Sequence, residues 1–239
     1  MTGTPSTRDT ARSFLHRLGL IEAVHLWMGR LTPVWLQGFM RFPPFGSAIQ
    51  RAAIATGDYS RYASLALALR RIEADGIAGA IAEVGVYQGA TSRFLLRCAT
   101  QRTLYLFDTF EGFPTQDRER ANRDDARFRD TSAESVRRAL GDAANVVIRK
   151  GRFPGTAEGL EAEGFALVIL DLDIYQPTLS GLEFFYPRLA RGGYVFVHDY
   201  NSPESNSACR RAVTQFMAGK PEQIVELPDN WGSAVIRKS

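Results

Sequence analysis

Carboxylates follow two short apolar runs of the 239-residue sequence. Asp171 and Asp173 come directly after the run at 168–170, and His198 and Asp199 follow a second run at 195–197. Short apolar runs closed by turn residues are typical of buried parallel strands, and open α/β sheets bind ligands beyond the carboxyl ends of such strands. The pattern therefore predicts a functional site built from these strand ends.

The two carboxylates of the first group are two residues apart. Strand alternation would point Asp171 and Asp173 to the same side of the sheet. Like charges this close need a cation, a shared proton or a substrate hydroxyl. The alternative interpretation is that Asp173 simply caps the helix that follows it.

The second strand end suggests what such a site could do. Asp171 and Asp199 could share a divalent cation, and their oxygen ligands suit magnesium. The ion would bind a substrate hydroxyl and lower its pKa, and Asp173 or His198 could accept the proton. A single histidine at a strand end is ordinarily a packing residue, but the neighbouring Asp199 favours a functional role for His198.

A glycine-punctuated turn follows an earlier strand-like stretch. Gly85 permits a tight backbone turn, and Gly89 lets the next helix begin close to a ligand. The spacing differs from the Gly-x-Gly-x-x-Gly of dinucleotide sites, and no Gly-Lys-Ser/Thr follows for a nucleoside triphosphate. Asp108 ends the next expected strand, where an acid would bind both ribose hydroxyls. This combination favours S-adenosylmethionine, and Glu83 and Ser92 are further candidates for cofactor contacts.

From residue 80 onward, strand-like and helix-like stretches alternate, which predicts an α/β fold with a doubly wound, mostly parallel sheet. Strands are expected at 80–84, 103–107, 146–148, 165–170 and 194–197, helices at 90–99, 132–140, 178–189 and 208–217, and a terminal antiparallel pair at 223–227 and 233–236. A long loop is expected at 109–130, and its charged part at 117–130 is expected to close over the substrate, because such loops inside compact domains are usually functional or mobile.

Three segments are expected along the chain. Residues 1–12 read as disordered, residues 13–75 as a helical extension and residues 76–239 as the main domain. Within the extension, 13–30 and 59–74 carry apolar residues at near-helical spacing. The extension could cover the domain, form a dimer face, or contact a membrane surface or an apolar substrate, and burial against the domain or a subunit is favoured.

The bulk composition excludes several classes of protein. The chain is 45% hydrophobic with a net charge of +3, and it has no stripe of Lys and Arg with interleaved aromatics to bind nucleic acid. No uncharged apolar run approaches the roughly 18 residues of a membrane span, and the first residues do not resemble a signal peptide. Cys98 and Cys209 form neither a metal-binding spacing nor a disulfide framework. We therefore expect a cytoplasmic protein.

Four blocks of the sequence resemble the macrocin-type O-methyltransferases, which methylate sugar hydroxyls on macrolides and related glycosides. The blocks are EVGVYQG at 83–89, FDTFEGF at 107–113, LDLDIY at 170–175 and GGYVFVHDY at 192–200. The resemblance spans about residues 57–220. It implies a class I S-adenosylmethionine-dependent fold with a seven-stranded sheet, a divalent metal that is usually magnesium, and a homo-oligomer.

Carried over position by position, the resemblance implies that Asp171 binds the metal and that Asp173 is the general base. Asp199 matches the second of two adjacent metal-binding acids, and His198 stands where the family has the first. This departure leaves open whether the metal is magnesium or a softer ion such as manganese or iron, because softer ions accept imidazole as a ligand more readily. It also leaves open a metal-free enzyme in which His198 takes the proton.

We therefore expect an S-adenosylmethionine-dependent O-methyltransferase that acts on a hydroxyl of a sugar in a secondary metabolite or surface glycan. One alternative is the metal-independent enzyme with His198 as the base. Another is a catalytically idle, cofactor-binding partner in a biosynthetic complex, against which the clustered carboxylates argue. A nicotinamide oxidoreductase is disfavoured because the glycine fingerprint is missing.

Overall fold

The computed structural model of the chain describes residues 46–117, 127–203 and 206–239. Its strands are β1 (Ala80–Val84), β2 (Leu104–Asp108), β3 (Val146–Lys150), β4 (Phe165–Leu170), β5 (Leu189–Val197), β6 (Ile224–Leu227) and β7 (Ser233–Arg237). Its helices are α4 (Ser47–Ala55), α5 (Tyr59–Ala74), α6 (Ala90–Cys98), α7 (Ala133–Ala139), α8 (Tyr175–Arg188) and α9 (Ala208–Met217). Within these ranges, no helix combines the length and apolar character needed to cross a bilayer. The predictions for 1–12 and for the helix at 13–30 lie outside the described residues.

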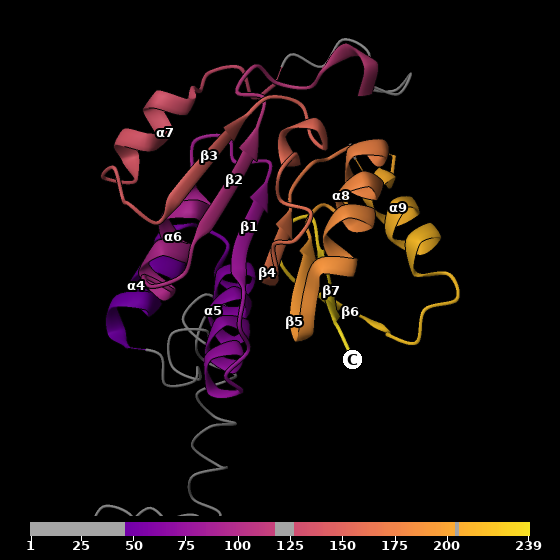
Figure 1. Ribbon diagram of the computed structural model, residues 1–239, viewed down its shortest axis with the longest axis horizontal. Helices are drawn as coiled ribbons and strands as arrows, with labels where there is room; N and C mark the ends of the chain where they lie inside the picture. The colour runs from indigo at the N-terminus through magenta and orange to yellow at the C-terminus, as the bar shows by residue number, and fades with distance from the viewer. Residues whose placement is uncertain (1–45, 118–126, 204–205) are drawn as a thin grey trace, which may run out of the picture. The chain divides into compact units, whose positions relative to one another are not determined.

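The strands form one seven-stranded sheet in the order β3-β2-β1-β4-β5-β7-β6 (Figure 1). Neighbours from β3 to β5 pair in parallel, and β7 pairs antiparallel with both β5 and β6. The predicted α/β fold with a doubly wound, mostly parallel sheet is therefore confirmed. The chain builds outward from β1 to β3 and then returns to place β4 on the other side of β1. Such a switch point is where open α/β sheets bind ligands.

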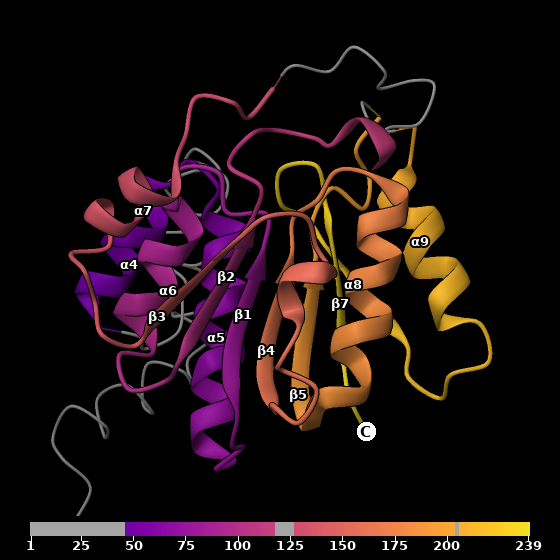
Figure 2. The ribbon, with the colours of Figure 1, turned by 45° about the horizontal axis from the view of Figure 1, so that its top comes forward.

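Helices cover both faces of the sheet (Figures 1 and 2). Helices α4 to α7 pack on one face, where β4 contributes Leu167 and Ile169, and α8 and α9 pack on the other, where β4 contributes Val168 and Leu170. Every residue of β4 is buried. A strand that is covered on both faces needs apolar side chains at every position, which explains the unbroken apolar run in the sequence.

The helix before the sheet belongs to the sheet domain. Residues 45–239 form one compact unit, and Leu65, Leu69 and Ile72 of α5 are buried in the core on the α4–α7 side. The boundary that the sequence placed between residues 75 and 76 therefore falls inside this unit. The bounds of α5 agree with the predicted helix at 59–74 because its apolar stripe has a helical period.

Two elements differ from the expected bounds. Helix α8 begins at Tyr175 rather than at 178, with Pro177 in its first turn. Proline is tolerated there because backbone N–H groups of the first turn have no acceptor within the helix. Strand β5 begins at Leu189 rather than at 194, and its ladder with β4 is irregular where Gly192 and Gly193 occur. The glycines that predicted a break thus lie within a strand that bends around them.

Gly85 lies in close contact with the chain directly after β4. The backbone N–H of Asp171 donates to the carbonyl of Val84 at 2.9 Å, and Gly85 has a φ of +89°. A Cβ at this position would lie 1.8 Å from the carbonyl oxygen of Asp171. Glycine is therefore required here by both backbone conformation and space, and the contact fixes Asp171 against the glycine turn.

The substitution Gly85→Ala should destabilise the protein by about 3 kcal/mol or more, because it adds a backbone clash to an unfavourable φ. Gly57→Ala is the matched control, since Gly57 has a φ of +81° and nothing lies within 4 Å of the added Cβ. That control should cost only about 1 kcal/mol. Urea unfolding measures both values, and equal costs would contradict the close approach of β1 and β4.

Candidate active site

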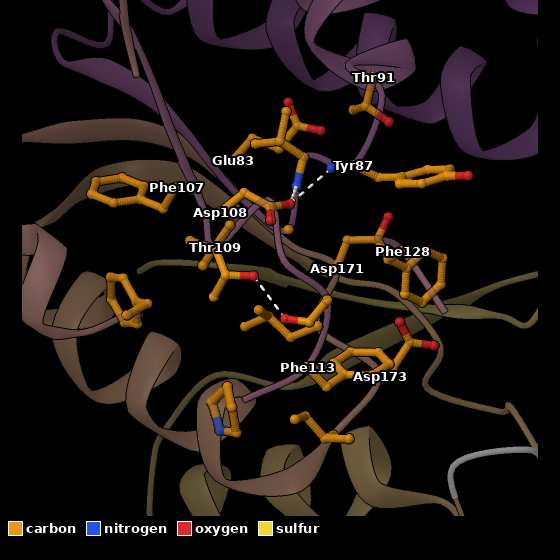
Figure 3. Close-up of a pocket in the computed structure, with 18 of the residues that line it drawn as sticks. Glu83, Tyr87, Thr91, Phe107, Asp108, Thr109, Phe113, Phe128, Asp171 and Asp173 are labelled. Carbon is orange, nitrogen blue, oxygen red and sulfur yellow. Dashed lines mark hydrogen bonds between the residues drawn. The ribbon is translucent and has the colours of Figure 1, made fainter. Parts of the chain in front are cut away.

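A cavity of about 340 Å³ lies at the carboxyl ends of β1, β2 and β4 (Figure 3). Its wall includes Glu83 and Gly85 from β1 and the turn after it, Asp108 from β2, and Asp171 and Asp173 from the loop after β4. The structure thus brings together residues that the sequence placed at three separate strand ends. The cavity occupies the switch point of the sheet, where a ligand site is expected.

Asp108 organises the glycine turn. Its Oδ2 accepts hydrogen bonds from the backbone N–H groups of Val86 at 2.7 Å and Tyr87 at 2.8 Å (Figure 3). Its Oδ1 accepts one from the backbone N–H of Phe110 at 2.6 Å. An ionised carboxylate offers about four acceptor positions. One position is therefore left for a ligand, so Asp108 can accept one ribose hydroxyl beside its structural role but not both of the predicted pair.

The other cofactor candidates divide into two groups. Glu83 lines the cavity, and its Oε2 accepts a hydrogen bond from Ser92 Oγ at 2.5 Å. Ser92 is fully buried and does not line the cavity, so its contact is with Glu83. Gly89 also stays out of the cavity wall and provides the left-handed N-cap of α6, with a φ of +75°. Burial raises the pKa of Glu83 to about 8.

Asp171 lies between two cationic side chains. Its Oδ2 accepts a hydrogen bond from Arg61 Nη2 at 2.7 Å, and its Oδ1 lies 3.2 Å from His198 Nδ1. Burial favours the neutral acid, but the charges of Arg61 and His198 hold the pKa of Asp171 well below its usual range. Asp171 is therefore a half-buried carboxylate that stays ionised.

His198 connects Asp171 to Asp199, whose Oδ2 lies 2.8 Å from His198 Nδ1. Burial disfavours the imidazolium, but the carboxylate of Asp171 outweighs it and the pKa of His198 is raised to about 10. Neither His198 nor Asp199 lines the cavity, whereas Asp171 does. The structure therefore places His198 and Asp199 in support of Asp171, away from the cavity wall.

Asp173 reaches the cavity from the loop between β4 and α8. Strand β4 ends at Leu170, so strand alternation does not govern Asp173, which has a φ of +59°. The N-cap of α8 is Ile174, and no side chain caps this helix. The alternative interpretation of Asp173 as a helix cap is therefore not what the structure shows, and its carboxyl group faces the cavity with Asp171 (Figure 3).

The surroundings of Asp173 favour its protonated form. Burial, together with the charges of Asp199 and Asp171, raises the pKa of Asp173 to about 8. Arg127 opposes this effect, with its Nη2 at 4.0 Å from Asp173 Oδ1. Asp171 and Asp173 thus have pKa values displaced in opposite directions, which is a pattern found at acid–base sites.

Aromatic rings form another part of the wall. The ring centre of Phe128 lies 5.1 Å from that of Tyr87 and 5.4 Å from that of Phe113, and all three line the cavity (Figure 3). The guanidinium of Arg127 lies over Phe128 at 5.2 Å. Phe128 comes from the predicted charged loop, of which residues 118–126 lie outside the described part of the chain. The sequence analysis did not identify these rings.

Arg61 is the other functional candidate that the sequence analysis missed. It lines the cavity from α5 and is only 8% exposed. Leu65, Leu69 and Ile72 share its face of the helix at a spacing of three and four residues, and all are buried. A charged residue on an otherwise apolar stripe was the available signal, since buried arginines are almost always paired.

The predicted metal ligands can be tested against these contacts. Asp171, His198 and Asp199 each offer one ligand atom within 4.8 Å of the others, so the structure does gather them. Both oxygens of Asp171 already face Arg61 and His198, and Nδ1 of His198 faces Asp199. An arginine does not lose its charge in a protein, so a divalent ion here would meet a fixed cation. The carboxylate of Asp171 is thus already paired with the positively charged side chains of Arg61 and His198, and this arrangement does not fit a divalent metal.

Comparison with known proteins decides the family. The family model described as Macrocin-O-methyltransferase (TylF) matches residues 48–230, which is most of the chain. The chain belongs to the macrocin O-methyltransferase family. The match includes α5 as well as the sheet, in agreement with the packing of that helix inside the domain.

Named relatives carry the same chemistry in their descriptions. The 8-demethyl-8-(2,3-dimethoxy-alpha-L-rhamnosyl)-tetracenomycin-C 4'-O-methyltransferase of Streptomyces olivaceus is 31% identical over 174 residues, or 65% of this chain and 64% of the relative. The mycinamicin III 3''-O-methyltransferase of Micromonospora griseorubida is 30% identical over 173 residues, or 64% of this chain and 66% of the relative. The chain therefore spans slightly less than two thirds of the length of each.

Solved structures share the fold. The O-methyltransferase NovP has a TM-score of 0.62 at 24% identity and covers 76% of this chain and 80% of its own. The calicheamicin methyltransferase CalS11 has a TM-score of 0.61 at 18% identity and covers 98% of this chain and 94% of its own. The macrocin O-methyltransferase fold of this chain is thus a class I methyltransferase fold, as the resemblance implied.

Glu83 should make the stability of this family member depend on pH. Its folded pKa of about 8 exceeds the ordinary value of 4.5, so the protonated form stabilises the fold fully below about pH 4.5. That contribution is lost as the pH rises toward 8, because the unfolded chain releases the proton first. The variant Glu83→Gln removes the titration and keeps an oxygen acceptor for Ser92.

Thermal unfolding between pH 5 and pH 9 measures this effect. Relative to Glu83→Gln, the wild type should lose several degrees of Tm between pH 5 and pH 8 and then follow a parallel curve. The control Glu158→Gln changes an exposed acid and should leave the difference from wild type constant. Parallel curves for wild type and Glu83→Gln over the whole range would contradict the raised pKa of Glu83.

Proposed function

We propose that this protein is an S-adenosylmethionine-dependent O-methyltransferase that acts on a sugar hydroxyl of a secondary metabolite or surface glycan. The observation that carries the proposal is the single cavity that joins the glycine turn after β1, Asp108 of β2 and Asp173 after β4. Family membership supports the methyl donor. The name of the Streptomyces olivaceus relative, which specifies a rhamnosyl group, supports the acceptor class.

The glycine turn and Asp108 would hold S-adenosylmethionine. The backbone turn at Gly85 lines the cavity, and Asp108 keeps an acceptor position for a ribose hydroxyl. Glu83 lines the same part of the cavity and has a proton to donate near neutral pH, since its pKa is raised to about 8. The bound donor supplies an electrophilic methyl group attached to a positively charged sulfur.

Asp173 is the proposed general base. The acceptor oxygen forms a bond to the methyl carbon as the carbon–sulfur bond breaks, its electron pair stays on sulfur, and the hydroxyl proton moves to the Asp173 carboxylate. A pKa of about 8 suits this task, because a base is most effective when its pKa lies near the working pH. His198 does not line the cavity, so we assign it to positioning Asp171 and write the reaction without a metal.

The aromatic wall suits an acceptor with an apolar face. Tyr87, Phe113 and Phe128 present rings to the cavity in which Asp171 and Asp173 lie (Figure 3). A sugar ring has apolar C–H faces and polar edges, and pockets that bind such molecules combine aromatic rings with a few polar groups. A cytoplasmic location, a homo-oligomer and the absence of a nucleic-acid partner stay predictions from the sequence.

Asp173→Asn should lower methyl transfer at least about 100-fold, because the amide cannot accept the proton. The assay measures transfer of labelled methyl from S-adenosylmethionine to a panel of rhamnosides and other deoxysugar glycosides. Glu111→Gln is the control, since Glu111 is an exposed acid that does not line the cavity, and it should retain the wild-type rate. The wild-type rate should rise as the pH passes through about 8, where Asp173 loses its proton.

Calorimetric titration with S-adenosylhomocysteine tests the donor site independently of the acceptor. Wild type and Asp173→Asn should bind it with the same affinity, because Asp173 is assigned to the acceptor side. A wild-type protein that does not bind S-adenosylhomocysteine would overturn the methyltransferase proposal. An Asp173→Asn variant with the wild-type rate would contradict the assignment of the base.

A further inference from the structure

Arg61 is a buried cation at the place where the family resemblance implies a metal, and its role rests on the proposed methyl transfer. It is 8% exposed, it lines the cavity, and its Nη2 donates to Asp171 Oδ2 at 2.7 Å. The neighbouring wall residue Asp173 is the proposed base. A fixed positive charge therefore lies in the same cavity as the group that takes the acceptor's proton.

Stability alone does not account for this ion pair. Replacing a buried ion pair by well-packed apolar residues is often neutral or stabilising, because two charges must be taken out of water. The rest of this face of α5, which includes Leu65, Leu69 and Ile72, is apolar and buried. An apolar residue at position 61 would continue that face, so a charge there points to a task in the cavity.

The chemistry of a guanidinium matches the task that a metal would perform. An arginine has five N–H donors, and among the described residues the guanidinium of Arg61 donates a hydrogen bond only to Asp171. The acceptor oxygen gains negative charge as its proton moves to Asp173. A donor and a positive charge held in place beside that oxygen stabilise the charge at no cost of reorganisation.

We propose that Arg61 replaces the divalent metal of the family as the cation that binds the acceptor oxygen, and that Asp171, His198 and Asp199 hold Arg61 in position. Asp171 uses one oxygen for Arg61 and the other for His198. His198 in turn contacts Asp199. His198 stands where the resemblance implies the first of two adjacent metal-binding acids. His198 and Arg61 therefore both contribute positive charge beside Asp171, where a metal ion would otherwise contribute it.

Manganese titration followed by electron paramagnetic resonance tests whether the charge of Arg61 excludes a metal. Wild type should show no saturable site that depends on Asp171, whereas Arg61→Ala should bind Mn²⁺ at least about 100-fold more tightly, because a cation near the carboxylates is removed. The gain should disappear in Arg61→Ala/Asp171→Asn. Arg71→Ala is the matched control on the same helix, since Arg71 has a side chain that is 59% exposed, and it should behave as wild type.

Arg61→Lys separates charge from packing. It keeps the positive charge and changes the shape, so it should exclude Mn²⁺ as the wild type does. Weak binding at Asp58, His198 and Asp229, a second group with ligand atoms within 4.8 Å, is recognised because Asp171→Asn does not remove it. An Asp171-dependent Mn²⁺ site in the wild type, or in Arg61→Lys, would overturn the proposal.

Two further readouts separate this inference from the proposed function. S-adenosylhomocysteine should bind wild type, Arg61→Ala and Arg61→Lys alike, which shows that the variants fold and that the donor site is intact. In the methyl-transfer assay, Arg61→Ala should lower kcat at least about 100-fold. An unchanged kcat would overturn the role of Arg61 and leave the methyltransferase proposal standing, whereas loss of S-adenosylhomocysteine binding by the wild type would overturn the methyltransferase proposal itself.

Discussion

The carboxyl ends of β1, β4 and β5 gather more acid than a protein interior tolerates without compensation. Four carboxyl groups lie there: Glu83, Asp171, Asp173 and Asp199. Burial makes each unpaired negative charge costly. The guanidinium of Arg61 and the imidazole of His198 contact Asp171 and keep it ionised, while the pKa values of Glu83 and Asp173 rise to about 8. One permanent anion is thus held between two cations, and its neighbours hold protons near neutral pH.

The fold supplies these charges from distant parts of the chain. Arg61 comes from α5, ahead of the sheet, Asp171 follows β4, and His198 follows β5. They meet because β4 lies next to β1, on the side opposite β2, and β5 lies next to β4. Helix α5 packs on the face of the sheet to which β4 contributes Leu167 and Ile169. The close approach of Gly85 to Asp171 fixes the glycine turn after β1 against the loop after β4. The site therefore depends on the assembled domain, and no single element contains it.

The elements and site residues that were predicted correctly are those that a short stretch of sequence determines by itself. The bounds of α5, β1, β4 and α9 agree with the expected 59–74, 80–84, 165–170 and 208–217, because helical periods and unbroken apolar runs are properties of short stretches. The acids of the site were found because they lie at the ends of such runs or within a few residues after them. The early start of β5 at Leu189 was not found, because Gly192 and Gly193 indicate a break when the neighbouring strand is unknown.

Long-range pairing accounts for what the sequence could not predict. Arg61 and Asp171 are 110 residues apart, and nothing near either residue names its partner. The same limit applied to His198, whose neighbours in sequence suggested a metal ligand or a base. Its position away from the cavity wall emerges from the packing of β5 against β4. The metal prediction came from the clustered carboxylates and from the family resemblance, and neither of these could reveal the contact of Arg61 with Asp171.

A crystal structure of the full chain with S-adenosylhomocysteine, from crystals soaked in Mn²⁺ and measured at the manganese absorption edge, tests the account most directly. The account predicts the ligand in the cavity at the ends of β1 and β2 and the guanidinium of Arg61 still on Asp171. It also predicts no anomalous peak between Asp171 and Asp199. A manganese peak at that position, with Arg61 displaced from Asp171, would contradict it.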